Sequence, residues 1–202
     1  MRITTVLLLL GFLPAAAQRP LQRDLREHEQ TLAPYVLSPQ PIVDKMLELA
    51  NIKPGDLVYD LGCGDGRILI TAAQRYKAHG VGIEISPKLV EMTSALVKRL
   101  GLQEQVEIRL GNILEVKFSD ADVVTLYLET NSNEMLRPAM EKQLRPGTRV
   151  VSHDFEVRGW KTAKVEKIHA YNRNHTIYLY EIGAPASVKA PPKKKAAQAK
   201  AQ

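Results

Sequence analysis

The residues best suited to chemistry form a short loop that reads Asp60-Leu61-Gly62-Cys63-Gly64-Asp65-Gly66. An apolar segment, 57–61, precedes it, and the residues after it have the apolar spacing of a helix. Glycines at such a junction let the backbone turn tightly and approach a ligand closely. A dinucleotide-binding loop would need a third glycine at position 67, which is arginine. The loop therefore predicts a cofactor site of another kind, with ordinary turn glycines as the alternative.

A second acidic residue supports the cofactor site. Glu84 follows Gly64 by 20 residues and ends the next apolar segment. A carboxylate at this place can accept hydrogen bonds from both hydroxyls of a ribose. A strand before the loop, a helix after it, and acids at Asp60 and Glu84 together favour a cofactor over simple turns.

This pattern resembles the first two motifs of class I S-adenosylmethionine (SAM)-dependent methyltransferases. The resemblance implies that Asp60 and the glycine loop hold the methionine end of SAM and that Glu84, beside Ile85, holds the ribose. It places adenine contacts at Asn112 and Ile113, after the third strand. The class usually has aspartate where this chain has Asn112, whose side chain is a neutral acceptor. The cofactor-site residues expected are Tyr35, Asp60, Gly62, Cys63, Gly64, Gly66, Glu84, Ile85, Asn112 and Ile113.

A closer resemblance covers about residues 33–183. Residues 34–39 read Pro-Tyr-Val-Leu-Ser-Pro and resemble the Pro-Tyr-Val-Pro-Thr-Pro segment of small archaeal-type protein-lysine methyltransferases, which are similar to mitochondrial lysine methyltransferases. Residues 125–136, 145–155 and 174–180 are similar to later strand segments of the same proteins. The resemblance implies transfer of a methyl group from SAM to a protein lysine. It also makes Tyr35 a candidate lid over the cofactor, unless this segment only packs on the sheet.

The expected reaction needs positioning more than acid–base chemistry, because the methyl group leaves a sulfonium by in-line displacement. The lysine must arrive neutral, and a desolvated channel beside a cation lowers its pKa. We expect Tyr127, Glu129 and His153 to be the catalytic residues, with Glu129 orienting the incoming ammonium. A solvated loop carboxylate is the alternative for Glu129, and a loop hydrogen bond is the alternative for His153. Further candidates for the channel are Asn131, Asp154, Phe155 and Trp160, the last of which could instead pack on the surface.

The elements that must position these residues alternate between strands and helices, which predicts an α/β fold with a mostly parallel sheet. The expected class is a Rossmann-like, seven-stranded methyltransferase fold with an antiparallel hairpin at one edge. Ser38 is expected to cap a helix that has Pro39 at its first position. Pro138 is expected to interrupt or bend another helix. The expected strands are 57–61, 81–85, 106–110, 121–128, 148–152, 165–169 and 176–182, and the expected helices begin near 39, 67, 86 and 133.

The two ends differ in composition from the body. Residues 1–17 combine Arg2, a short apolar run and Ala15-Ala16-Ala17, which is typical of a secretory signal peptide and too short to span a bilayer. Residues 187–202 are a Lys/Ala/Pro tail that is expected to be disordered. Between them we expect a helical or extended segment, 18–38, and the methyltransferase domain, 39–186.

Charge and cysteine content limit the classes of function. The net charge is +6, but five tail lysines and Arg2 account for all of it. The neutral body gives no support for nucleic-acid binding. One cysteine in 202 residues excludes a disulfide scaffold and a thiolate-rich metal site. The five histidines show no ligand spacing, so we expect no metal.

Other functions remain open at this point. A DNA amino-methyltransferase would carry a proline pair after the fourth strand, where this chain has Glu129-Thr130-Asn131-Ser132. A small-molecule methyltransferase would usually add a cap, for which the body has little sequence. A non-enzymatic SAM-binding protein is the third alternative.

We expect a monomer that acts on proteins with accessible lysines. The signal predicts export to the periplasm or medium, although SAM is made in the cytoplasm, which is the alternative location.

Overall fold

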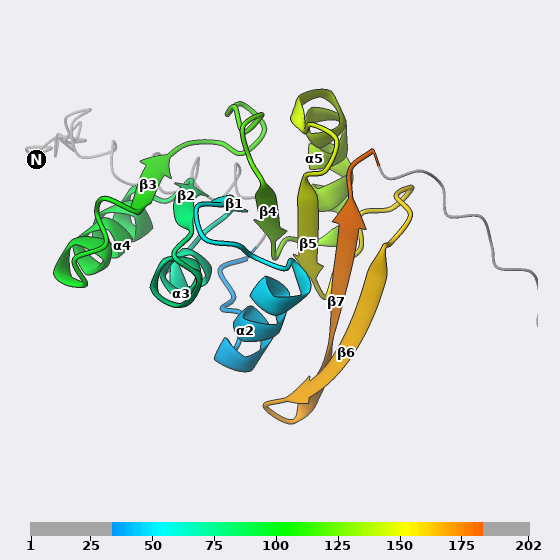
Figure 1. The fold of residues 1–202 in the computed structure, drawn as a ribbon, viewed down its shortest axis with the longest axis horizontal. Coiled ribbons are helices and arrows are strands. Elements are labelled where there is room, and N and C mark those ends of the chain that lie inside the picture. The colour runs from blue at the N-terminus through cyan, green and yellow to red at the C-terminus, as the bar shows by residue number, and fades with distance from the viewer. Residues whose placement is uncertain (1–33, 184–202) are drawn as a thin grey trace, which may run out of the picture.

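The computed structural model describes residues 34–183, so the expected signal peptide, most of segment 18–38 and the basic tail lie outside the described residues. Its centre is one seven-stranded sheet with the strand order β3-β2-β1-β4-β5-β7-β6 (Figure 1). Neighbouring strands from β3 to β5 are parallel, whereas β7 pairs antiparallel with both β5 and β6. The predicted α/β fold and its antiparallel edge hairpin are therefore confirmed. The strands are β1 (Leu57–Leu61), β2 (His79–Glu84), β3 (Val106–Leu110), β4 (Val123–Leu126), β5 (Arg149–His153), β6 (Lys164–Ala170) and β7 (Arg173–Glu181).

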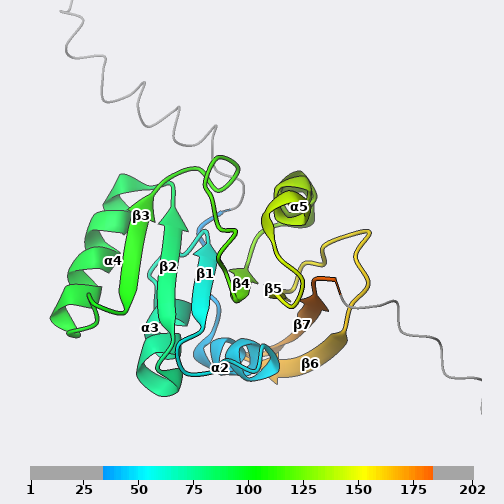
Figure 2. The same ribbon diagram turned by 45° about the horizontal axis from the view of Figure 1, so that its top comes forward.

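Helices cover both faces of the sheet (Figure 2). The helices α2 (Gln40–Leu49), α3 (Arg67–Tyr76) and α4 (Pro87–Arg99) lie on one face, and α5 (Thr130–Gln143) lies on the other. Because successive strand residues point to opposite faces, Val58 packs with α2 and α3, whereas Tyr59 and Leu61 belong to the cluster under α5. The central strand β1 is buried on both faces, as expected for a parallel sheet.

Several local expectations need correction. Pro39, not Ser38, takes the N-cap position of α2, and no side chain caps that helix. The Ser38 hydroxyl instead lies 2.9 Å from Nδ1 of the buried His153. Helix α5 begins at Thr130 and runs through Pro138 without interruption, and β4 is shorter than its apolar sequence suggested. The hairpin turn has only Tyr171 and Asn172 at its tip, both with positive φ, which is the geometry of a tight two-residue hairpin turn.

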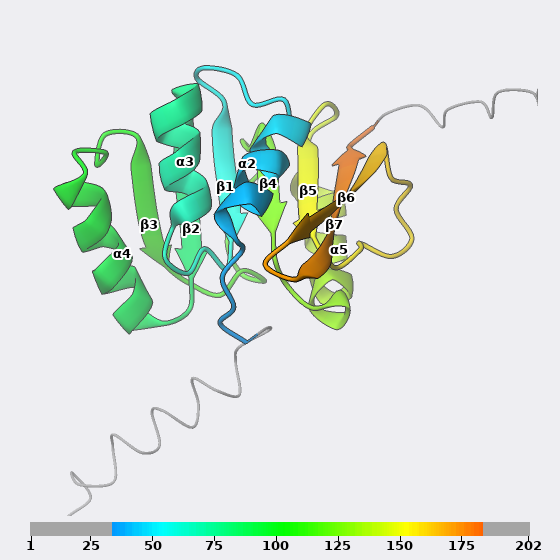
Figure 3. The same ribbon diagram turned by 90° about the horizontal axis from the view of Figure 1, so that it is seen from below.

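The amino-terminal segment 34–39 runs across the end of the sheet toward α2 (Figure 3). We call it the strap. It passes near the carboxyl ends of the parallel strands, where open α/β sheets bind their ligands. Within residues 34–183, no helix is both long enough and apolar enough to span a membrane.

Candidate active site

A cavity of about 620 Å³ opens at the carboxyl ends of the parallel strands. This volume is in the usual range for a site that takes a small molecule or cofactor. The strap, the glycine loop, Glu84 and the start of α4 form most of its wall. The predicted residues on the wall are Tyr35, Asp60, Gly62, Cys63, Gly64, Glu84, Ile85, Asn112, Ile113 and Tyr127. Of the other residues predicted to bind the cofactor or to be catalytic, Gly66, Glu129 and His153 are not part of it.

The glycine loop needs its glycines. Gly62, Gly64 and Gly66 have φ of 86°, 52° and 71°, a region that other residues rarely adopt. A Cβ atom on Gly64 would lie 2.8 Å from Cε2 of Tyr35, so the ring sits directly against the loop. Gly66 instead precedes α3 as its N-cap and packs against Thr93, which explains its absence from the cavity wall. The Thr93 hydroxyl donates to the carbonyl oxygen of Gly64 at 2.7 Å and ties the loop to α4.

Glu84 organises the loop as well as the cavity. Its Oε2 accepts a hydrogen bond from the Gly64 amide at 2.9 Å. Its Oε1 accepts from the amides of Ile85 and Ser86 at 2.9 and 3.0 Å. A carboxylate can accept about four hydrogen bonds, so room remains for a ligand donor. The residue is therefore both a structural clamp and a candidate ribose contact.

Asp60 has a different environment. It is buried on β1, and its Oδ1 accepts a hydrogen bond from the Thr125 hydroxyl at 2.7 Å. Burial raises the pKa of Asp60 to about 7, and nearby Glu84 and Asp65 also raise it. A cationic ligand would stabilise the ionised form of this carboxyl. The amino group of a bound amino acid moiety has this charge.

Cys63 and Asn112 are already engaged by the protein. The Cys63 sulfur packs against Gly82 of β2, where a Cβ atom would lie 2.6 Å from Sγ. Burial, with nearby carboxylates, raises the pKa of this thiol, which disfavours the thiolate. Asn112 Oδ1 accepts from the Leu114 amide at 3.0 Å and keeps a second lone pair for a ligand.

The strap is held over the cavity by two residues that sequence reasoning missed as site residues. Arg67 donates from Nη1 to the Ser38 carbonyl oxygen at 2.8 Å. Asp65 fixes the same guanidinium through contacts of 2.6 to 3.0 Å. The Arg67–Asp65 pair therefore connects the glycine loop to the strap, and Tyr35 is placed as a lid would be.

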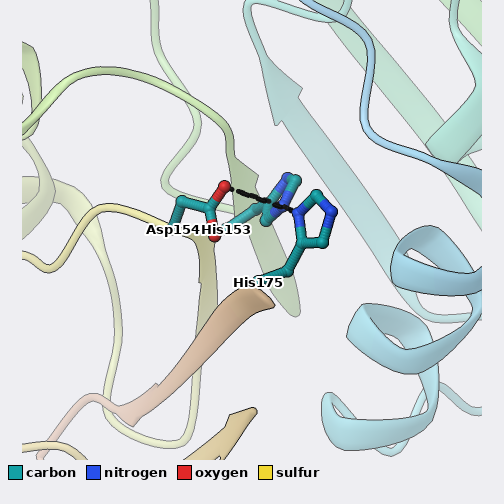
Figure 4. Close-up of side chains that lie close together, drawn as sticks. All are labelled: His153, Asp154 and His175. Atoms are coloured by element: carbon teal, nitrogen blue, oxygen red, sulfur yellow. Dashed lines mark hydrogen bonds and ion pairs between the residues drawn. The ribbon is translucent and has the colours of Figure 1, made fainter. Parts of the chain in front are cut away.

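His153, Asp154 and His175 form a hydrogen-bonded cluster (Figure 4), which contacts Tyr127 through His153. Nε2 of His153 lies 2.8 Å from Nδ1 of His175 and 3.2 Å from Oδ2 of Asp154. His175 Nδ1 is 3.5 Å from the same oxygen. The Tyr127 ring stacks on His153 with centroids 3.9 Å apart. Burial lowers the pKa of His153 to about 4, so this histidine is neutral at pH 7.

These three side chains are also close enough to hold a metal ion, a grouping that their sequence spacing concealed. The antiparallel pairing of β7 with β5 brings His175 beside His153 across 22 residues of chain. However, Arg173 already places its guanidinium 2.7 Å from Oδ2 of Asp154. The guanidinium of Arg173 would therefore compete with a metal ion for this carboxylate.

The remaining channel candidates are spread around the edge. Glu129 is exposed at the N-cap position of α5, and Asn131 is exposed in its first turn. Phe155 lies 6.2 Å from the Tyr127 ring, measured between centroids. Trp160 packs edge-on against Tyr180 and donates to Glu141 at 2.8 Å, which agrees with a packing role. Arg173 was not predicted as a site residue, because the sequence of the hairpin does not indicate which residues at the ends of other strands this arginine contacts.

The site fits SAM. Two buried carboxylates face one cavity, and the backbone of the glycine loop forms part of the same wall. Asp60 and the loop would hold the amino acid end, Glu84 the ribose, and Asn112 with Ile113 the adenine. This assignment to parts of the cofactor remains a prediction from the family motifs.

Comparison with known proteins agrees with this fit. The chain is 50% identical over 151 residues to a protein-lysine N-methyltransferase of Saccharolobus islandicus, covering 74% of this chain and 94% of that protein. It is 30% identical over 144 residues to the adenine nucleotide translocase lysine N-methyltransferase of Mus musculus, covering 69% of this chain and 62% of the mouse protein. A solved RNA methyltransferase of Salinibacter ruber, in complex with S-adenosylhomocysteine, is 45% identical with a TM-score of 0.69 and covers 74% of this chain and 95% of that one.

The ANTKMT methyltransferase domain matches residues 60–164, which run from the glycine loop to the first residue of β6. The matched residues include the glycine loop, Glu84, Asn112, Tyr127 and His153, whereas the strap and His175 lie outside them. The chain is therefore a SAM-dependent methyltransferase that belongs to the ANTKMT methyltransferase domain family.

Proposed function

We propose that this enzyme methylates the side-chain amine of lysine in a protein substrate. The observation that carries the proposal is the 50% identity to a protein-lysine N-methyltransferase over 94% of that protein's length. The mouse relative also carries a lysine methyltransferase name. The cavity supports it because the wall includes Tyr127, whose hydroxyl is a polar group near the sheet edge where a side chain from a partner could enter.

The residues of the chain can favour a neutral amine. Bound SAM supplies the methyl group and a positive sulfonium. The Tyr127 hydroxyl can accept a hydrogen bond from an amine N–H while the nitrogen lone pair stays free for attack. Apolar wall residues such as Leu128 and Ile113 limit water, which disfavours the ammonium form. Glu129 lies outside the cavity, so its proposed part is to attract the substrate ammonium before it enters.

RNA is the second candidate substrate, because the Salinibacter structure is named an RNA methyltransferase at 45% identity. The charge distribution argues for protein. Residues 18–186 hold 22 acidic and 22 basic residues, and binding to a phosphate backbone is usually driven by a basic surface. A small-molecule amine is the third candidate, and the open sheet edge favours a large substrate over it.

A competition assay distinguishes these substrates. The full chain would receive tritiated SAM with a lysine-rich protein mixture, total RNA and polyamines in one tube. Separate digestion with protease and ribonuclease then locates the label. We expect protease-sensitive label in added protein and no label in RNA. Ribonuclease-sensitive label, or label only in polyamines, would contradict the proposal.

The location and assembly are proposals of the same kind. We propose that the enzyme acts as a monomer and that residues 1–17 direct its export. Amino-terminal sequencing of the protein from cell fractions tests the second point. A mature chain that begins near Gln18 in the exported fraction supports it, and an intact Met1 in the cytoplasm contradicts it.

A further inference from the structure

We propose that Arg173, on the edge hairpin, positions Tyr127 at the cavity wall through a hydrogen bond to its hydroxyl, so that this hydroxyl meets the substrate amine. The proposal rests on the proposed function, because it concerns how the amine is received. Arg173 is the first residue of β7, and Tyr127 directly follows the last residue of β4. The two strands are not neighbours in the sheet, since β5 lies between them.

Two contacts fix the Tyr127 side chain. Its ring stacks on His153 with an angle of 28° between the planes. Its hydroxyl oxygen accepts a hydrogen bond from Nη2 of Arg173 at 3.0 Å. A tyrosine has two main side-chain torsions, and a contact on the ring face with another at the hydroxyl restrains both. The position of the hydroxyl is therefore set by the cluster, which contacts the ring face, and by the hairpin, which contacts the hydroxyl oxygen.

Arg173 is itself anchored. The same Nη2 that donates to Tyr127 lies 2.7 Å from Oδ2 of Asp154. Asp154 is held by two backbone contacts, since its Oδ1 accepts from the Thr176 amide at 2.9 Å and its own amide donates to the Thr176 carbonyl at 2.6 Å. Although burial opposes it, the Thr176 amide, His153 and the guanidinium keep the pKa of Asp154 below its ordinary value. The carboxylate is thus a fixed anion that aims Arg173 at Tyr127.

The arrangement leaves Tyr127 chemically useful. A phenol oxygen has two lone pairs and one proton. Arg173 occupies one lone pair, and the second can accept from a substrate N–H. The guanidinium also places a positive charge beside the incoming group, which disfavours an ammonium there. Arg173 is a positioning residue, because it acts through the Tyr127 hydroxyl.

A double-mutant cycle in the full chain tests this role. Arg173→Ala and Tyr127→Phe should each lower kcat for protein methylation about tenfold, with the SAM dissociation constant within about twofold of wild type. The double variant should lose no more than either single variant, because both changes remove one shared interaction. Arg145→Ala is the matched control. Its guanidinium also pairs with an aspartate, Asp122 at 2.6 Å, but the pair lies at the amino ends of β4 and β5.

A spectroscopic measurement separates positioning from general damage. Tyrosine labelled with carbon-13 at Cζ gives one signal per residue, and Tyr127→Phe identifies the signal of interest. The Arg173 guanidinium favours the phenolate, so Arg173→Ala should move the Tyr127 titration to higher pH, and Arg145→Ala should not move it.

Three outcomes would overturn the inference. They are losses that multiply in the double variant, a Tyr127 titration that does not respond to Arg173, and an Arg173→Ala enzyme with wild-type kcat. The proposed function fails by a different result, namely a wild-type enzyme that labels no protein lysine. The two failures can therefore be told apart.

Discussion

At the scale of single residues, the two buried acids of the cavity have different tasks. The Glu84 carboxylate accepts hydrogen bonds from three backbone amides, which stabilise its charge and shape the glycine loop. Asp60 accepts a hydrogen bond from the Thr125 hydroxyl, and burial raises the pKa of Asp60 to about 7. Asp60 is therefore the acid that gains most from a cationic ligand, and Glu84 is the one that maintains the loop.

The raised pKa of Asp60 predicts that SAM binding depends on pH. A cation prefers the ionised carboxyl, so below pH 7 binding must first remove a proton. The dissociation constant should rise as the pH falls below 7, by up to about tenfold per pH unit. Isothermal titration calorimetry from pH 8 to 5.5 measures this. In Asp60→Asn the affinity should be weaker and nearly independent of pH, and a wild-type affinity that stays constant to pH 5.5 would contradict the role.

The three amide contacts of Glu84 predict a large effect of Glu84→Gln. The new amide nitrogen can only donate hydrogen bonds. In either orientation of the amide, it would therefore face a backbone N–H group that also donates, that of Gly64 or that of Ile85. The free energy of SAM binding should weaken by about 2–3 kcal/mol, as expected for lost hydrogen bonds to a charged group. Calorimetry measures the change, with Glu91→Gln on the exposed side of α4 as the control. Equal affinity of Glu84→Gln and wild type would remove Glu84 from the site.

At the scale of elements, the strap and the hairpin come from opposite ends of the described chain and meet the same cluster. Ser38 of the strap contacts His153 on one ring nitrogen, and His175 of β7 contacts the other. Arg67 at the start of α3 holds the strap from the cavity side. The lid side and the substrate side of the site are therefore joined through one buried histidine.

This connection predicts that Ser38→Ala destabilises the protein. The variant leaves Nδ1 of a fully buried histidine without the Ser38 hydroxyl. An unsatisfied buried polar atom costs about 1–3 kcal/mol of unfolding free energy. Urea denaturation of wild type and Ser38→Ala measures the loss, with exposed Ser119→Ala as the control. A wild-type midpoint for Ser38→Ala would show that the contact contributes nothing.

The elements also explain which parts of the site the sequence could predict. Asp60, Gly62, Gly64 and Glu84 follow or end parallel strands, and such ends meet at one edge of the sheet, so their motif spacing was enough. The cluster of His153, Asp154 and His175 depends on the antiparallel register of β7, which a local pattern does not specify. Ser38 looked like a helix cap from its local sequence, although its partner lies 115 residues away.

At the scale of the whole molecule, the described body is a neutral methyltransferase fold with its cavity at one sheet edge, and the basic charge lies near the ends of the chain. Most of the fold could be predicted, since strand and helix periodicity and the edge hairpin were sufficient. The ends of the elements could not be predicted, because β4 stops at Leu126, two residues before the end of the apolar run 121–128. Pro138 also fits inside α5, so its effect depends on its surroundings and not on sequence alone.

The whole site predicts activity without a metal ion. The cluster offers three possible metal ligands, but the Arg173 guanidinium already pairs with the Asp154 carboxylate. Methyl transfer from a sulfonium also needs no Lewis acid to create the electrophile. Activity after exhaustive treatment with EDTA should equal that of untreated enzyme. Loss of activity that Zn²⁺ or another divalent ion restores would refute this and point to His153 and His175.

The most direct test of the account is to identify the methylated amino acid. The full chain, with its five tail lysines changed to arginine to prevent labelling of the tail, would be incubated with SAM carrying a deuterated methyl group and a lysine-rich protein mixture. Acid hydrolysis and mass spectrometry then identify the product, with Glu84→Gln as the enzyme deficient in SAM binding. The account predicts that the enzyme with the lysine-free tail produces deuterated ε-N-methyllysine in the added protein. The Glu84→Gln enzyme should produce much less. Tight SAM binding without any methyllysine, or deuterium only in nucleotides or small amines, would contradict it.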